Sequence, residues 1–117
     1  MRIEVRGHGV DVPEALRDHA TRRVRFALSR FGDHIRFVRV RFEDHNGPRG
    51  GIDTECRLQI DGPRIGPRIV QAEALDAFEA VDQAAATAQR TIRRALDRWH
   101  TTLVPPRGGR VKLRTAS

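Results

Sequence analysis

One long apolar stripe near the carboxyl end constrains the fold of this chain more than any other feature. From Phe78 onward, apolar side chains recur every three or four residues and stay within a stripe about 100° wide on a helix. The apolar residues of this stripe are Val81, Ala85, Ala88, Ile92, Leu96, Trp99 and Leu103. The segment Val104-Pro105-Pro106 ends the helix. A helix with one apolar side is stable only when that side is buried. The rest of the chain must therefore supply a layer for residues 78–103 to cover.

Three segments alternate apolar and polar residues in the manner of half-buried strands. These are residues 2–6, 35–43 and 53–60, and residues 70–74 predict a fourth strand that leads into the long helix. Glycine and asparagine within 45–51 predict a loop between two antiparallel strands. In the third strand, the side chains expected to point outward are those of Asp53, Glu55, Arg57 and Gln59.

Residues 14–30 predict a second helix, earlier in the chain. Pro13 and the acidic residues beside it favour a helix start. Gly32 is expected to end this helix, whose apolar side chains share one face and are Leu16, Ala20, Val24, Ala27, Leu28 and Phe31.

The order of these elements predicts an α+β fold with the order β-α-β-β-β-α. Because each strand has a single apolar side, we expect a four-stranded sheet with two helices packed on one face. The 117 residues suffice for one modest core. We expect one domain over residues 1–104, followed by a basic, flexible tail over residues 105–117.

The charge of the chain favours a polyanionic partner. The formal net charge is +7, and 21 of the 22 basic residues are arginine, which can grip phosphate through two bonds and stack on a base. A genome rich in G and C would also favour arginine over lysine. Nucleic acid and an acidic membrane surface both fit this charge. No apolar run approaches the roughly 20 residues that span a bilayer, and the start lacks the pattern of a secretory signal, so we expect a cytoplasmic protein without a membrane partner.

Arginines gather on both expected helices. On the long helix they lie opposite the apolar stripe and are Arg90, Arg93, Arg94 and Arg98. On the first helix, three lie beside its core face with His19 and Phe26, namely Arg22, Arg23 and Arg30, while Arg17 and Arg25 extend the positive surface. Such faces are often merely solvated, but two of them on neighbouring helices predict a surface that matches RNA phosphates.

Two further groups of side chains allow more than one interpretation. Phe26 lies away from the core stripe, and it either stacks on a base or covers an edge of the core. The outward strand residues Arg39, Arg41 and Arg57 are expected to form cross-strand pairs with Glu43 and Glu55, outside the binding site.

Catalytic and metal-binding patterns are weak in this sequence. The five histidines lie on different elements without the spacing of metal ligands, and no nucleophile stands beside a base. Cys56 falls in the core register of its strand, and a single cysteine forms no intramolecular disulfide. We therefore expect no enzymatic activity, no metal, no cofactor and no small-molecule substrate.

Several motifs, taken in order, resemble the family of hibernation promoting factor and ribosome-associated inhibitor A, also called sigma-54 modulation proteins. The similarity covers about residues 1–100. It depends on Ile-Glu-Val-Arg-Gly in the first strand, Glu14-Ala-Leu-Arg17, Val38-Arg-Val40, and Asp76-Ala-Phe-Glu-Ala-Val-Asp82. The basic run from Arg90 to Arg98 follows where the family is also basic, whereas Phe26 and Thr87 replace residues that are basic in many relatives.

This resemblance implies a fold similar to that of double-stranded RNA-binding domains. It also implies a short family member that lodges in the small-subunit channel for messenger and transfer RNA, and silences or preserves ribosomes under stress. The expected partners are the 30S subunit and the 70S ribosome, contacted through 16S ribosomal RNA. The positions that carry over from the family are Arg17, Arg22, Arg23, Arg90 and Arg94; the remaining arginines follow from helix geometry alone.

Two other functions stay open at this point. The chain could be a general module for structured RNA that acts away from the ribosome, with similar affinity for any duplex. It could also be a protein-interaction module, for example a homodimer that uses the outer face of the sheet. A general RNA module predicts binding that weakens steeply as salt rises. A protein-interaction module predicts self-association that does not depend on the helix arginines.

Overall fold

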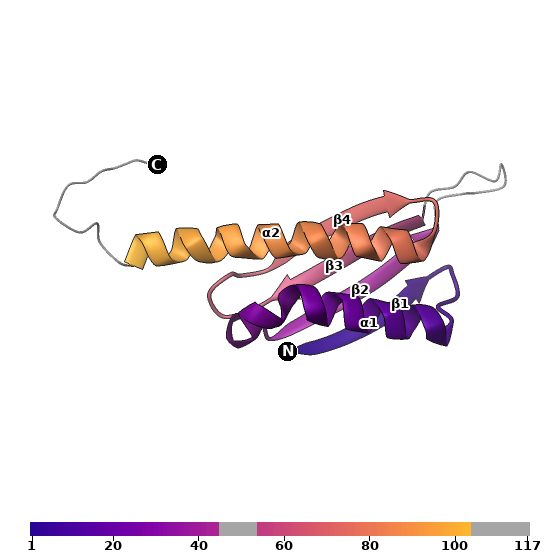
Figure 1. The fold of residues 1–117 in the computed structure, drawn as a ribbon, viewed down its shortest axis with the longest axis horizontal. Coiled ribbons are helices and arrows are strands. Elements are labelled where there is room, and N and C mark those ends of the chain that lie inside the picture. Colours follow the sequence, from indigo (N-terminus) through magenta and orange to yellow (C-terminus); the bar gives the residue numbers. More distant parts are fainter. Residues whose placement is uncertain (45–53, 104–117) are drawn as a thin grey trace.

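In the computed structural model, which describes residues 1–44 and 54–103, a four-stranded sheet carries two long helices on one face (Figure 1). The predicted loop at 45–51, the predicted stop at Val104 and the predicted tail at 105–117 lie outside these residues. The elements in chain order are β1 (Arg2–His8), α1 (Glu14–Leu28), the 3-10 helix η1 (Ser29–His34), β2 (Phe37–Asp44), β3 (Thr54–Asp61), β4 (Arg68–Ala74) and α2 (Ala77–Leu103).

The sheet is mixed, and its strands lie in sequence order. β1 and β2 are parallel and are joined through α1, as a parallel pair requires, whereas β2, β3 and β4 pair as antiparallel neighbours. The register sets Val38 opposite Ile60 and Val40 opposite Leu58, so the apolar residues of adjacent strands point to the same side. The predicted α+β fold with the order β-α-β-β-β-α is confirmed.

The core lies between the sheet and the two helices. Alternate residues of β2 and β3 are fully buried, including Val38, Phe42 and Cys56. α2 covers β3 and β4 with a face built largely of small residues, which allows its backbone to approach its neighbours closely: Ala80, Val81, Ala84, Ala85, Ala88, Ile92 and Ala95. Four residues of the predicted apolar stripe, Val81, Ala85, Ala88 and Ile92, belong to this face.

The first helix ends earlier than the sequence predicts. α1 stops at Leu28 and tightens into η1, so Gly32 lies inside the 3-10 segment and is not the stop. Tight turns of this kind are common at helix ends. The change in pitch seats Phe31 in the core with 7% exposure and delays the next strand, so β2 begins at Phe37 and not at residue 35.

One outward-facing strand residue is buried. Glu55 lies on the outer side of the sheet, as its register predicts, but it is only 5% exposed. It stands in one cross-strand row with Glu43 and Glu73, and its carboxylate lies 3.9 Å from the guanidinium of Arg57. Glu55 is buried because β3 lies between β2 and β4, which shield it from water. The alternation of residues along one strand does not reveal whether that strand is central.

The turn between β3 and β4 supports the far part of α2. Gly62 lies against the backbone of His34, where a Cβ atom would overlap the His34 carbonyl oxygen, and Gly66 has a φ of +66°, which favours glycine. Beyond them, the guanidinium carbon of Arg64 lies 5.1 Å from the ring centroid of Trp99. The His34 ring also contacts Trp99, at 6.2 Å between centroids, so two elements hold α2 where it passes the end of the sheet.

Candidate nucleic-acid interface

The two helices carry the arginines that the sequence predicts to bind RNA. α1 and α2 lie side by side on the sheet, so that their outward sides adjoin (Figure 1). We call the sides of the two helices that do not pack on the sheet, together with the 3-10 segment η1, the helix-pair surface. Its exposed arginines are Arg22 and Arg25 on α1, Arg30 in η1 and not on the first helix as predicted, and Arg90, Arg93, Arg94 and Arg98 on α2.

Most of these guanidinium groups are not neutralised. Within residues 1–44 and 54–103, no carboxylate lies within 4 Å of six of them, namely Arg22, Arg25, Arg30, Arg90, Arg93 and Arg94. Arg90 donates a hydrogen bond to the neutral Thr87 hydroxyl at 3.3 Å, which leaves its charge in place. The helix-pair surface therefore offers positive charge to a partner.

Arg98 lies on a side of α2 that is buried over the sheet, and not opposite the apolar stripe as the sequence predicts. Arg98 follows Ala80 by five helical turns and thus points in the same direction. Ala80 is fully buried, whereas Arg98 is exposed. The difference arises because α2 extends past the end of the sheet (Figure 1). The length of α2, 27 residues, thus enlarges the basic surface.

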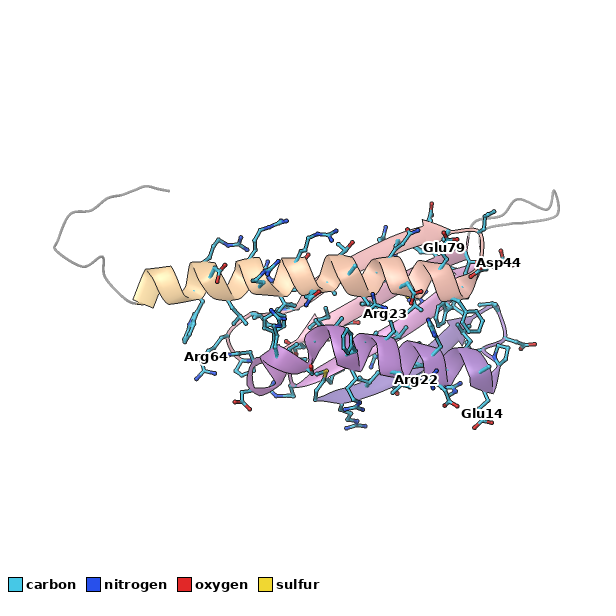
Figure 2. All side chains as sticks on the ribbon, in the orientation of Figure 1. Glu14, Arg22, Arg23, Asp44, Arg64 and Glu79 are labelled. Carbon is cyan, nitrogen blue, oxygen red and sulfur yellow. The ribbon has the colours of Figure 1, made fainter. Side chains whose placement is uncertain are left out.

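Two of the predicted site residues have structural partners. The Arg17 guanidinium donates a hydrogen bond to the carbonyl oxygen of Val5 at 2.7 Å, which ties α1 to β1. Arg23 lies 3.4 Å from a carboxylate oxygen of Asp82, and Figure 2 shows it between the two helices, with Arg22 over α1. These two arginines hold α1 in place, Arg17 while still exposed and Arg23 while half-buried.

Asp82 connects the two helices, a role that the sequence did not reveal. The same oxygen that approaches Arg23 lies 2.8 Å from His19 Nε2. The ring of His19 also contacts that of Phe78, at 5.1 Å between centroids. The only sequence signal for this contact was the position of Phe78 and Asp82 on one side of the helix, four residues apart.

Phe26 does not cover the core. Its side chain is 78% exposed, the most of any large apolar residue in the described chain. A shallow hollow of about 300 Å³ lies beside it, lined by Phe26, His19, Arg22 and Arg23. Of the two predicted roles for this ring, packing on an edge of the core is therefore wrong.

The outer face of the sheet has a different electrostatic character. Arg39 pairs with Glu4 across the strands at 3.1 Å, Arg41 pairs with Glu43 along its own strand at 3.7 Å, and Arg57 bonds to Gln71 at 3.2 Å. All three arginines lie near carboxylates, but the predicted cross-strand pairs with Glu43 and Glu55 are wrong: the described pairs with these two residues run along one strand, and the cross-strand carboxylate is that of Glu4. Hydrogen bonds from Arg6 and Arg39 also lower the pKa of Glu4. Arginine on this face is largely neutralised.

The described residues hold little that could do other chemistry. Burial and, to a lesser extent, the Glu55 carboxylate raise the pKa of the Cys56 thiol to about 12, so the thiol stays protonated and unreactive at neutral pH. Among residues 1–44 and 54–103, no three His, Cys, Asp or Glu side chains gather as a metal site. In the same ranges, no helix is long and apolar enough to cross a membrane.

The fold and this surface define a small α+β protein with a basic helix pair over a mixed sheet. The chain belongs to the Sigma 54 modulation protein / S30EA ribosomal protein family, whose sequence profile matches residues 3–100. The resemblance drawn from the motifs is therefore confirmed. No curated protein matches the chain.

Solved structures share the fold at low sequence identity. One is a ribosomal subunit interface protein from Coxiella burnetii, with 20% identity and a TM-score of 0.70, over 83% of this chain and 99% of that one. Another is the N-terminal domain of Protein Y from Thermus thermophilus, with 19% identity and a TM-score of 0.66, over 80% of this chain and 98% of that domain. At such identities, the likeness establishes the architecture and not the residues of a site.

Proposed function

We propose that this protein is a non-catalytic, ribosome-binding regulator of translation. It acts in the cytoplasm, occupies the messenger and transfer RNA channel of the small subunit, and silences or preserves ribosomes under stress. Membership of the Sigma 54 modulation protein / S30EA ribosomal protein family supports this proposal, as does the fold shared with a protein described as a ribosomal subunit interface protein.

The observation that carries the proposal is the set of arginines without carboxylate partners on the helix-pair surface. Guanidinium groups on two adjacent helices can contact phosphates on both sides of an RNA groove, which recognises the shape of the RNA and its backbone rather than its sequence. We assign the contacts with 16S ribosomal RNA to Arg22, Arg25, Arg30, Arg90, Arg93, Arg94 and Arg98. Arg17 and Arg23 contribute mainly by fixing α1.

Sedimentation with purified 30S subunits and 70S ribosomes, at near-physiological salt and beside a competing duplex RNA, tests this function. We expect saturable comigration that resists the competitor. The variant with Arg90, Arg93 and Arg94 changed to glutamine should lose it. A matched control changes Arg2, Arg6 and Arg36 to glutamine, which removes the same charge from exposed positions away from the helix-pair surface, and it should still comigrate.

Other outcomes of this experiment would point to the two alternative functions. Failure to comigrate, with retained binding to duplex RNA, would indicate a general module for structured RNA. Self-association that both glutamine variants retain, without ribosome binding, would indicate a homodimer or another protein-interaction module. Equal loss in both variants would show that net charge alone, and not the helix-pair surface, directs binding.

A further inference from the structure

An exposed aromatic ring stands in the middle of the basic part of α1. Phe26 is 78% exposed, although exposure of a phenylalanine to water is unfavourable. Arg22 and Arg25 lie about one turn or less from it on α1, Arg30 follows in η1, and each is exposed. The surface at this point is thus both apolar and strongly positive.

The hollow beside Phe26 has a defined shape. Its wall toward α2 is the His19 ring, which Asp82 holds by a hydrogen bond of 2.8 Å and which contacts Phe78. The four residues that line the hollow all belong to α1, and Asp82 of α2 holds two of them, His19 and Arg23. The Arg22 guanidinium lies at its rim and has no ion-pair partner in the described part of the chain.

RNA combines the two properties that this place requires. Each nucleotide carries a flat apolar base beside a negatively charged phosphate, whereas an apolar protein patch would meet the uncompensated arginines around Phe26. A base inside a duplex already has neighbours on both of its flat faces, so only an unpaired base can stack on an added ring. The chemistry therefore selects an unpaired nucleotide rather than a duplex.

We infer that Phe26 is the stacking platform for one unpaired base of the bound RNA, that the hollow beside it receives the edge of that base, and that Arg22 binds an adjacent phosphate. The inference rests on the proposed function in that it identifies the RNA element that the helix-pair surface contacts. It goes beyond that function because it assigns a contact to a residue that is not basic.

Two measurements test the stacking platform. The first compares the affinity of the protein for 30S subunits, for a single-stranded RNA and for a duplex RNA after Phe26 is changed to alanine, leucine or tryptophan. Loss of one stacked base lowers affinity by about 5- to 150-fold. We expect the alanine and leucine variants to lose this affinity for subunits and for single-stranded RNA, and the tryptophan variant to keep it. The affinity for the duplex should change little in all three variants.

The second measurement reports the stacking itself. A single-stranded RNA that carries the fluorescent base 2-aminopurine should be quenched when the protein binds, and the Phe26→Ala variant should lose this quenching even at saturation. Ile69→Ala serves as the matched control, since Ile69 is also exposed, at 62%, but lies on the outer side of the sheet. Ile69→Ala should behave like the unsubstituted protein in both measurements.

The results separate this inference from the proposed function. Unchanged affinity of Phe26→Ala for single-stranded RNA and subunits, rescue by leucine, or absence of quenching by the unsubstituted protein would each overturn the stacking platform. Any of these could occur while the Arg90, Arg93 and Arg94 variant still loses ribosome binding, in which case the proposed function stands. If that variant binds ribosomes normally, the proposed function fails, whatever Phe26 does.

Discussion

The salt dependence of binding offers a quantitative test of the helix-pair surface. Each phosphate that a guanidinium neutralises releases condensed cations, so the logarithm of the binding constant falls with the logarithm of salt concentration by about 0.9 per contact on a duplex. Six arginines of this surface have no carboxylate partner in the described chain. If all six contact phosphate, the slope should be about −5.

Neutralising three of the six should change this slope by a predictable amount. Substitution of Arg90, Arg93 and Arg94 by glutamine should reduce the slope to about −2.7 and, at about 0.1 M salt, weaken binding by up to about 500-fold. All three side chains are exposed and without described ion pairs, so the free energy of unfolding should hardly change.

Fluorescence titration of labelled 30S subunits over a range of potassium chloride concentrations gives the slope directly. The matched control carries glutamine at Arg2, Arg6 and Arg36, which lowers the net charge of +7 by the same three charges. Its slope should stay near −5. Equal slopes for the two variants would refute the assignment, because binding would then follow total charge and not particular contacts.

Three further predictions concern the structure that positions this surface. Gly62→Ala should lower the free energy of unfolding by about 1–3 kcal/mol, because the new Cβ overlaps the His34 carbonyl oxygen; urea denaturation measures this, and an unchanged midpoint would contradict the close contact. Arg17→Met should lower it by about 1 kcal/mol through loss of the bond to Val5 while the salt slope of RNA binding stays the same; a smaller slope would instead make Arg17 a phosphate ligand. Stability should fall as pH rises from 9 toward about 12, because the Cys56 thiol ionises in the unfolded chain near its ordinary pKa of 9.0 but is held protonated in the fold. The chain has no tyrosine, so urea midpoints of a Cys56→Ala variant should lose most of this alkaline trend, and an equally steep trend in the variant would contradict the burial of the thiol.

The sheet and its two helices could be predicted because the core depends on local periodicity. Alternation along β2 and β3 places Val38, Phe42 and Cys56 inward, and all three are fully buried. The helical spacing of apolar residues likewise places Ala88 and Ile92 of α2 inward, and both are fully buried. Such patterns are visible in a single sequence because alternate residues of a strand and successive turns of a helix meet the same core.

The partners of individual arginines could not be predicted in the same way. Arg17 and Arg22 both lie on α1, yet the former bonds to the backbone of β1 while the latter is exposed and unpaired in the described chain. Arg23 meets Asp82, which is 59 residues away and approaches only when α2 packs beside α1. Contacts of this kind depend on how the helices are placed, which no local pattern encodes.

The contrast between the two faces explains how a chain rich in arginine can direct one partner to one side. On the outer face of the sheet, carboxylates lie within 4 Å of Arg39, Arg41 and Arg57, so the opposite charges largely cancel at short range. On the helix-pair surface, six guanidinium groups lack such partners in the described chain, and their potentials add. We therefore expect a polyanion to approach the helices rather than the sheet, although both faces carry arginine. It is the placement of the acidic residues, more than that of the basic ones, that determines where RNA should bind.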